Sequence, residues 1–168
     1  MTKLEAFRAD KDHFFATDPD SPLTPEQKRS FRGLKYFAEN PALSLIVTVK
    51  EFPQKDEIQM QTTTGDVQPH TRFGRFKFTV DGQEAELTIY ADSHGFFLPF
   101  VDSLAGTETY GAGRYLEPEP LEKGKFLVDF NLAYNPYCAY DDRWSCPITP
   151  RENRLKVPIR AGEKMFHE

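Results

Sequence analysis

The polar residues best suited to chemistry lie in the C-terminal half of the chain, on an apolar framework. Alternation over residues 125–132 places Asp129 and Asn131 on the same face of a predicted strand. The opposite face is predicted to hold Phe126, Val128, Phe130 and Leu132. A buried carboxylate needs a partner. Arg114 is the expected partner of Asp129, through two parallel hydrogen bonds, in a pair that is either structural or ligand-facing.

Two carboxylates, Asp129 and Glu152, are candidates for a general base. With Arg114 as a clamp for an anionic group, either one would suit metal-independent hydrolysis or proton transfer on a small molecule. The sequence contains neither a Gly-x-Ser-x-Gly elbow nor a His-Glu-x-x-His helix. The glycine-rich residues 110–115 are not followed by a helix, so they do not predict a phosphate loop.

Residues 134–140 bring phenols, an amide and a thiol close together in sequence, and Cys146 follows shortly after. Cys138 and Cys146 are the two cysteines of the chain. In a reducing compartment both are expected to be free thiols. A reversible disulfide and a zinc site are the alternatives, but no Cys-x-x-Cys or paired histidine accompanies them, so no metal site is predicted.

Together these side chains predict a largely enclosed pocket. The predicted ligand-binding residues are Arg114, Asp129, Asn131, Tyr134, Asn135, Tyr137, Tyr140 and Glu152. Ligand sites are mostly apolar with a few convergent polar groups, so we expect a small organic molecule to bind, without a cofactor. One alternative is the metal-independent enzyme above. The other is a structural or protein-interaction domain, in which the polar groups only specify the fold.

Composition narrows the possible partners. The chain has 168 residues, with 21 Lys and Arg against 26 Asp and Glu, a net charge of −5. The acidic balance argues against binding to nucleic acid. No apolar run approaches the length of a membrane span. The N-terminus lacks the apolar core of a secretory signal, which predicts a cytoplasmic protein. The length predicts a single domain over 1–168, with its oligomeric state left open.

The first 40 residues predict a helical N-terminal segment. Leu4, Phe7, Phe14 and Phe15 recur among charges, which predicts a helix over 3–15 that lies on a larger body. Thr24 and Pro25 are typical of a helix start, and the helical spacing continues to a stop at Asn40 and Pro41.

The period then changes to two, and residues 43–132 predict a sheet. Strands are predicted at 43–50, 57–63, 72–80, 83–91, 96–101, 110–116 and 125–132. Asp81 and Gly82 predict a two-residue type I′ turn, with Val80 opposite Gln83. With no βαβ rhythm, the expected fold is mainly β: an antiparallel barrel or a strongly curled sheet, with two N-terminal helices.

Residues 133–168 predict a long irregular segment that caps this sheet. Prolines at 136, 147 and 150 leave no usable period over 133–153. Structureless segments of that length are often functional. Residues 155–159 predict a closing edge strand, where a proline is tolerated.

The chain resembles the bacterial and archaeal domain-of-unknown-function family numbered 1684, over residues 31–163. The resemblance is carried by Thr109–Leu116, by Asp129–Asn131 with Ala133–Tyr140, and by Cys146-Pro147 followed by Glu152-Asn153. It implies a globular domain of unassigned activity and transfers no catalytic residue.

Overall fold

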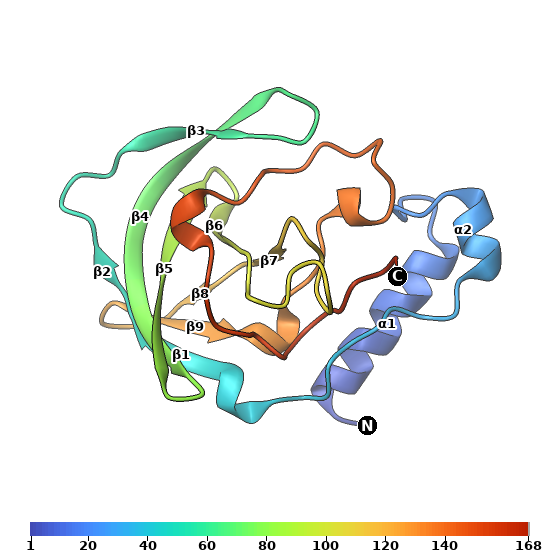
Figure 1. The fold of residues 1–168 in the computed structure, drawn as a ribbon, viewed down its shortest axis with the longest axis horizontal. Coiled ribbons are helices and arrows are strands. Elements are labelled where there is room, and N and C mark those ends of the chain that lie inside the picture. Colours follow the sequence, from blue (N-terminus) through green and yellow to red (C-terminus); the bar gives the residue numbers. More distant parts are fainter. Residues whose placement is uncertain (168) are drawn as a thin grey trace.

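The structure is a computed structural model that describes residues 1–167, and it is mainly antiparallel β-structure with two N-terminal helices. Figure 1 shows the strands on one side of the molecule and the helices on the other. The helices are α1 (Lys3–Thr17) and α2 (Pro25–Ser30). None of the helices within these residues is both long and apolar enough to cross a lipid bilayer.

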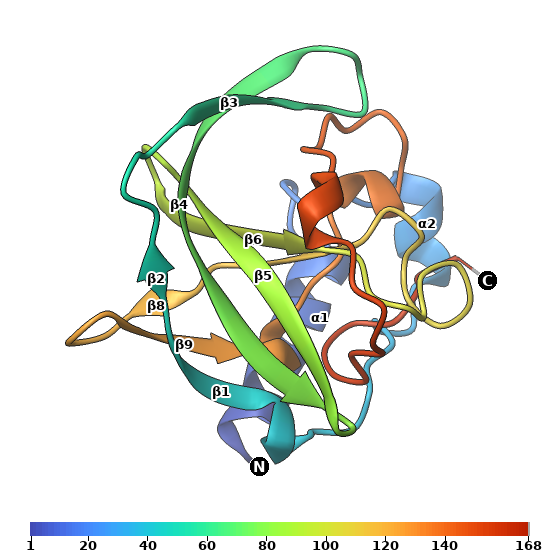
Figure 2. The ribbon, with the colours of Figure 1, turned by 60° about the vertical axis from the view of Figure 1, so that its left-hand side comes forward.

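Within residues 1–167, nine strands form two sheets. The strands are β1 (Ser44–Thr48), β2 (Lys50–Glu51), β3 (Glu57–Gln61), β4 (Val67–Val80), β5 (Gln83–Asp92), β6 (Gly95–Phe100), β7 (Arg114–Leu116), β8 (Glu119–Pro120) and β9 (Lys125–Asp129). One sheet has the order β1-β9-β8, and the other has β2-β4-β5-β6-β7 with β3 paired to β4. Figure 2 shows how strongly β4 and β5 curve across the molecule. The mainly β, antiparallel prediction is confirmed, but no ladder within residues 1–167 closes the two sheets into a barrel.

The β4–β5 hairpin confirms the predicted register. Val80 lies opposite Gln83, and Lys77 lies opposite Glu86. Asp81 and Gly82 have φ angles of 51° and 79°, the left-handed backbone that a type I′ turn requires. The alternation of apolar and charged residues therefore set the inner and outer faces of this ribbon.

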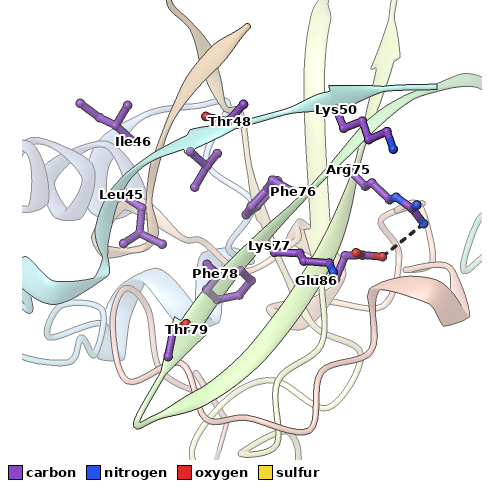
Figure 3. Close-up of a pocket in the computed structure, with 11 residues that line it drawn as sticks. Leu45, Ile46, Thr48, Lys50, Arg75, Phe76, Lys77, Phe78, Thr79 and Glu86 are labelled. Carbon is purple, nitrogen blue, oxygen red and sulfur yellow. Dashed lines mark ion pairs between the residues drawn. The ribbon is translucent and has the colours of Figure 1, made fainter. Parts of the chain in front are cut away.

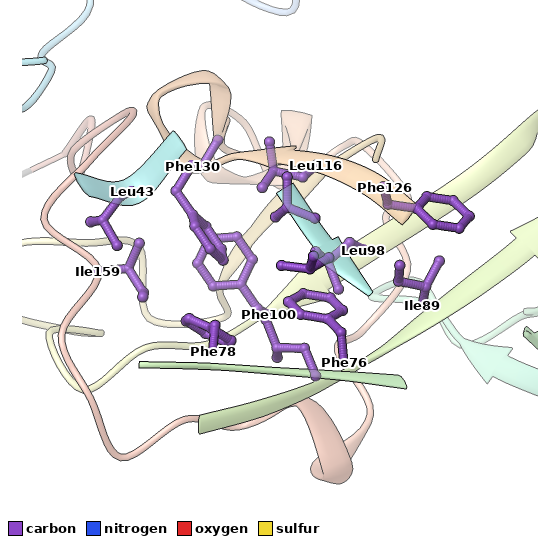
Figure 4. Packing of buried hydrophobic residues seen from close by; sticks show 14 of the residues in the cluster. Leu43, Phe76, Phe78, Ile89, Leu98, Phe100, Leu116, Phe126, Phe130 and Ile159 are labelled. Atoms are coloured by element: carbon purple, nitrogen blue, oxygen red, sulfur yellow. The ribbon is translucent and has the colours of Figure 1, made fainter. Parts of the chain in front are cut away.

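The core between the two sheets is built from aromatic rings and branched aliphatic side chains (Figure 4). The rings of Phe100 and Phe130 meet edge to face at 5.3 Å, and Phe78 lies 5.5 Å from Phe130. Offset and edge-on ring pairs of this kind add stability beyond the area they bury.

The second helix is shorter than predicted. The Thr24 hydroxyl caps α2 by accepting a hydrogen bond from the N–H of Gln27, so the predicted helix start is confirmed. The helix ends at Ser30, however, and does not reach Asn40. Gly33 adopts a φ of 112°, which a helix cannot accommodate. The N–H of Phe37 instead donates to the carbonyl of Gly162, and residues 35–37 run beside residues 162–164 of the C-terminal segment.

Two predicted strands are also corrected. Alternation stops at Asp129, because a 3₁₀ turn, η2 (Phe130–Leu132), follows it. Leu132 is consequently 39% exposed, whereas Asn131 is buried. The predicted closing strand over 155–159 is irregular, so the carbonyls of this segment need other partners.

Candidate functional site

Arg114 lies at the start of β7 and is 1% exposed. Its guanidinium donates to the carbonyl oxygens of Ile159, Ala161 and Glu163, and the distance from Nη2 to the Ile159 oxygen is 2.9 Å. Its charged partner is Asp102, 3.8 Å away, so the predicted pairing with Asp129 is wrong. All of these acceptors belong to the protein, and Arg114 therefore acts as an anchor for the C-terminal segment.

Burial lowers the pKa of Arg114 to about 10, against the opposing effect of the Asp102 and Glu163 carboxylates. The side chain is still protonated at neutral pH. Asp102 is itself fixed, because it accepts from the Thr109 hydroxyl at 2.7 Å and from the N–H of Ile159 at 2.8 Å. The buried charges are thus paired and hydrogen-bonded, as a stable buried ion pair requires.

A second buried network surrounds Glu163, which is 2% exposed. One carboxylate oxygen accepts from the Tyr140 hydroxyl at 2.8 Å and from the N–H of Asn135 at 3.0 Å. The other forms an ion pair with Lys11 of α1. Tyr140 and Asn135, which the sequence assigned to a pocket, therefore join the helix to the C-terminal segment instead.

Asn131 also has a structural role. Its side chain accepts from the N–H of Asn40 at 2.8 Å and donates to the Asn40 carbonyl at 2.9 Å. It also donates to Asp129 Oδ1 at 2.9 Å, and its main-chain N–H donates to the same oxygen at 3.0 Å. Asp129 Oδ2 has no hydrogen-bond partner among residues 1–167.

Glu152 lies at the other side of the molecule, against β4 and β5. Its carboxylate accepts two bonds from Arg72, one from the Tyr90 hydroxyl at 2.6 Å and one from Thr88 at 3.1 Å. Partial burial favours the neutral form, but the hydrogen bonds from Arg72 and Tyr90 outweigh it and hold the pKa of Glu152 below its usual range. With a lowered pKa and both oxygens already accepting hydrogen bonds, Glu152 is a poor general base.

Three of the eight predicted residues do line cavities. A crevice of about 260 Å³ lies beside α1, and we call it the α1 crevice. Its lining residues are Phe7, Leu116, Glu117, Pro118, Glu119, Leu127, Val128, Asp129, Leu132 and Tyr134. Its floor is apolar, and it contains the three carboxylates Glu117, Glu119 and Asp129 but no cationic side chain.

An adjoining hollow of about 440 Å³ shares Phe7 and Tyr134 with the α1 crevice, and we call it the aromatic hollow. Phe14, Phe15 and Tyr137 supply most of its remaining surface, with Asp10 and Lys11. The Tyr134 hydroxyl donates to Glu117, and the Lys11 ammonium lies 5.1 Å from the centre of the Tyr134 ring. Tyr134 therefore stands between an acidic crevice and an aromatic one.

A groove of about 600 Å³ separates β1 from β4 (Figure 3). Its floor is apolar, and Lys50, Arg75 and Lys77 lie on its rim. Arg75 pairs with Glu86 at 3.6 Å. Within residues 1–167, β1 pairs only with β9, and β4 beyond Arg75 pairs only with β5, so two strand edges face this groove without a partner.

The sequence missed several residues of these sites. Phe7 appeared only as one member of an amphipathic helix, yet it is 47% exposed between the two cavities by α1. Glu117 and Glu119 flank Pro118 and carried no recognisable motif. The sequence offered no signal for them, because the exposure of Phe7 on α1 is known only from the structure.

Comparisons with known proteins give a family and a fold. A family model described as "Protein of unknown function (DUF1684)" matches residues 29–164. No curated protein matches the chain. The solution NMR structure of an uncharacterized protein of Haloarcula marismortui is 36% identical, with a TM-score of 0.74, over 99% of this chain and 94% of that chain.

Replacing Arg114 should cost far more stability than replacing an exposed arginine. We expect Arg114→Met to lower the free energy of unfolding by about 3–5 kcal/mol, because three carbonyls and Asp102 lose their donor in a buried site. Arg75→Met, which breaks an exposed pair, should cost less than about 1 kcal/mol. Urea denaturation measures both. Equal losses would contradict the anchoring role, and Arg114→Lys, which keeps the charge without the planar fork, should fall between them.

The Glu152 cluster should make stability depend on pH. Because the pKa of Glu152 is lowered by folding, its contribution is present above the unfolded pKa and is lost as pH falls through the folded pKa. We expect wild type to exceed Glu152→Gln in stability above about pH 5, and the difference to shrink in acid. Glu122→Gln is an exposed control. A difference between wild type and Glu152→Gln that does not change with pH would contradict this assignment.

Proposed function

We propose that this chain, which belongs to the DUF1684 family of proteins of unknown function, binds a small organic cation with an apolar part. The ligand site is the α1 crevice. One observation supports this assignment above all: three carboxylates line a partly apolar crevice, and none of residues 1–167 that line it is cationic. A ligand with both a positive charge and an apolar part complements that combination.

The carboxylates have acceptor capacity to spare. Asp129 uses one oxygen for Asn131 and leaves Oδ2 without a partner among the residues described. Glu119 is exposed, and Glu117 accepts from Tyr134. An ammonium group has three donors, and its hydrogen bonds to carboxylates are stronger than those between neutral groups.

The apolar floor selects the rest of the ligand. Phe7, Leu127 and Leu132 are the partly exposed apolar residues of the lining, and they suit an alkyl or aryl group. The aromatic hollow extends the site past Phe7, so a longer ligand gains further ring contacts. The net charge of −5 favours the approach of a cation.

The enzyme alternative gains no support from the geometry. Arg114 is enclosed and bonded to main-chain carbonyls, so it cannot clamp a substrate anion. Glu152 accepts hydrogen bonds from Arg72 and Tyr90, and it is not among the residues that line the α1 crevice.

Phenethylammonium and phenylacetate test the proposed ligand class, because they share a ring and differ in charge. We expect phenethylammonium, but not phenylacetate, to shift the NMR amide resonances around Asp129 and Tyr134 in isotope-labelled protein. Asp129→Asn keeps the oxygen bonded to Asn131 but loses the charge. It should weaken binding about tenfold, since a hydrogen bond to a charged group contributes about 1.5–3 kcal/mol.

The matched control is Asp142→Asn, which removes an exposed carboxylate outside the lining of the crevice. It should bind phenethylammonium as wild type does. Equal shifts from both probes, or unchanged affinity of Asp129→Asn, would contradict the proposal.

The groove between β1 and β4 supports a second candidate function, the binding of an extended acidic peptide. The two strand edges that face it offer main-chain donors and acceptors for strand addition. In a two-residue hairpin Val80 bonds across to Gln83, so Lys77 and Thr79 present their main chains to the groove. The rim residues Lys50 and Lys77 repel a second copy of the same edge, and they favour a partner with carboxylates.

A dye-labelled peptide of alternating valine and glutamate tests the second candidate, with a valine–lysine peptide as its control. We expect the acidic peptide to bind, to slow hydrogen exchange at the amides of Lys77 and Thr79, and to dissociate as salt is raised. Lys50→Glu with Lys77→Glu should weaken binding at least about tenfold, because like charges across the groove repel. Unchanged exchange at these two amides would exclude strand addition.

A further inference from the structure

Cys138 and Cys146 lie against each other, although neither belongs to the cavities above. Cys138 is in a 3₁₀ turn, η3 (Tyr137–Ala139), and its N–H donates to Sγ of Cys146 at 3.2 Å. Both cysteines are free thiols in the structure. The sulfur of Cys146 is therefore already within reach of the Cys138 side chain, in an arrangement compatible with a short disulfide loop.

The main chain holds Cys146 in place from the other side. Its N–H donates to the Thr63 hydroxyl at 3.1 Å, and its carbonyl accepts from the N–H of Thr63 at 3.0 Å. The Tyr110 hydroxyl lies 3.7 Å from Sγ of Cys138. A hydroxyl at hydrogen-bond distance is positioned to stabilise a thiolate at Cys138.

The two thiols differ in exposure and in acidity. Cys138 is partly exposed, whereas Cys146 is buried. The hydrogen bond with Cys146, supported by that with Tyr110 and opposed by burial, lowers the pKa of Cys138 to about 7. The same hydrogen bond and burial raise the pKa of Cys146. One thiol is thus accessible and reactive, and its neighbour retains its proton.

We propose that Cys138 and Cys146 form a redox-active pair that reduces a hydroperoxide, with Cys138 as the attacking sulfur and Cys146 as the resolving one. This activity is separate from ligand binding in the α1 crevice. It rests on the contact between the two cysteines, on the exposure of one of them and on the Tyr110 hydroxyl beside it.

The proposed reaction proceeds in two balanced steps. The Cys138 thiolate attacks one peroxide oxygen, the O–O bond breaks, and the leaving oxygen takes a proton and departs as water or an alcohol. Cys138 is then a sulfenic acid. Sγ of Cys146 attacks it, an S–S bond forms, and the thiol proton leaves with the hydroxide as water. Two thiols have lost two electrons to the peroxide, and a thiol reductant restores them.

Hydrogen peroxide added to the reduced full-length protein tests this reaction. We expect the intact mass to fall by two hydrogens and both thiols to disappear together, with an intramolecular disulfide between Cys138 and Cys146 in the peptide map. At neutral pH, Cys138 should react about tenfold faster than an ordinary exposed thiol, because more of it is thiolate. A dithiol reductant should restore the original mass.

Variants separate the two roles. Cys146→Ala should stop at the sulfenic acid, which dimedone traps at Cys138, and Cys138→Ala should leave Cys146 unreactive because it is buried. Tyr110→Phe should raise the pH midpoint of Cys138 alkylation, a shift that a purely structural tyrosine would not cause. Equal reactivity of the two cysteines, or a disulfide only between molecules, would overturn the proposal. Since the mass and thiol measurements use wild type, a variant that fails to fold does not affect them.

Discussion

The C-terminal segment depends on one buried guanidinium. Residues 155–163 form no strand, so their carbonyl oxygens accept from scattered donors instead of from a continuous strand ladder. Arg114 supplies donors to three of these carbonyls from the start of β7, and Asp102 balances its charge. A planar group with five donors suits this task, because one rigid side chain satisfies several acceptors in different directions.

Other side chains take over main-chain pairing in the same way. Asn153, which is fully buried, accepts from the N–H of Thr88 and donates to the carbonyls of Thr88 and Pro99. Its amide thus bonds to β5 and β6 much as a neighbouring strand would. Similarly, the Glu163 carboxylate accepts a hydrogen bond from the main-chain N–H of Asn135. The irregular half of the chain is therefore ordered by polar side chains, and few of these remain available to a ligand.

Local patterns predicted local structure well. The β4–β5 register followed from a turn and its flanking alternation, since both involve residues that are near neighbours in sequence. The family resemblance was also confirmed. The site was predicted less well: Tyr134, Tyr137 and Asp129 line cavities, but Arg114 pairs with Asp102, not Asp129. The alternation pattern of a sequence indicates which polar side chains will be buried and need a partner. Only long-range packing decides which partner each one contacts.

The ion pair between Lys11 and Glu163 gives the N-terminal helix a wider significance. The family match begins at residue 29, so α1 lies outside it, yet α1 contributes a cation that pairs with Glu163, a buried carboxylate at the end of the matched region. Expressing the matched residues alone would remove this ion pair and uncover Tyr140, against which Phe15 of α1 packs. Truncation boundaries for this chain should therefore retain α1, and a homologue that begins later must supply its own cation at this position.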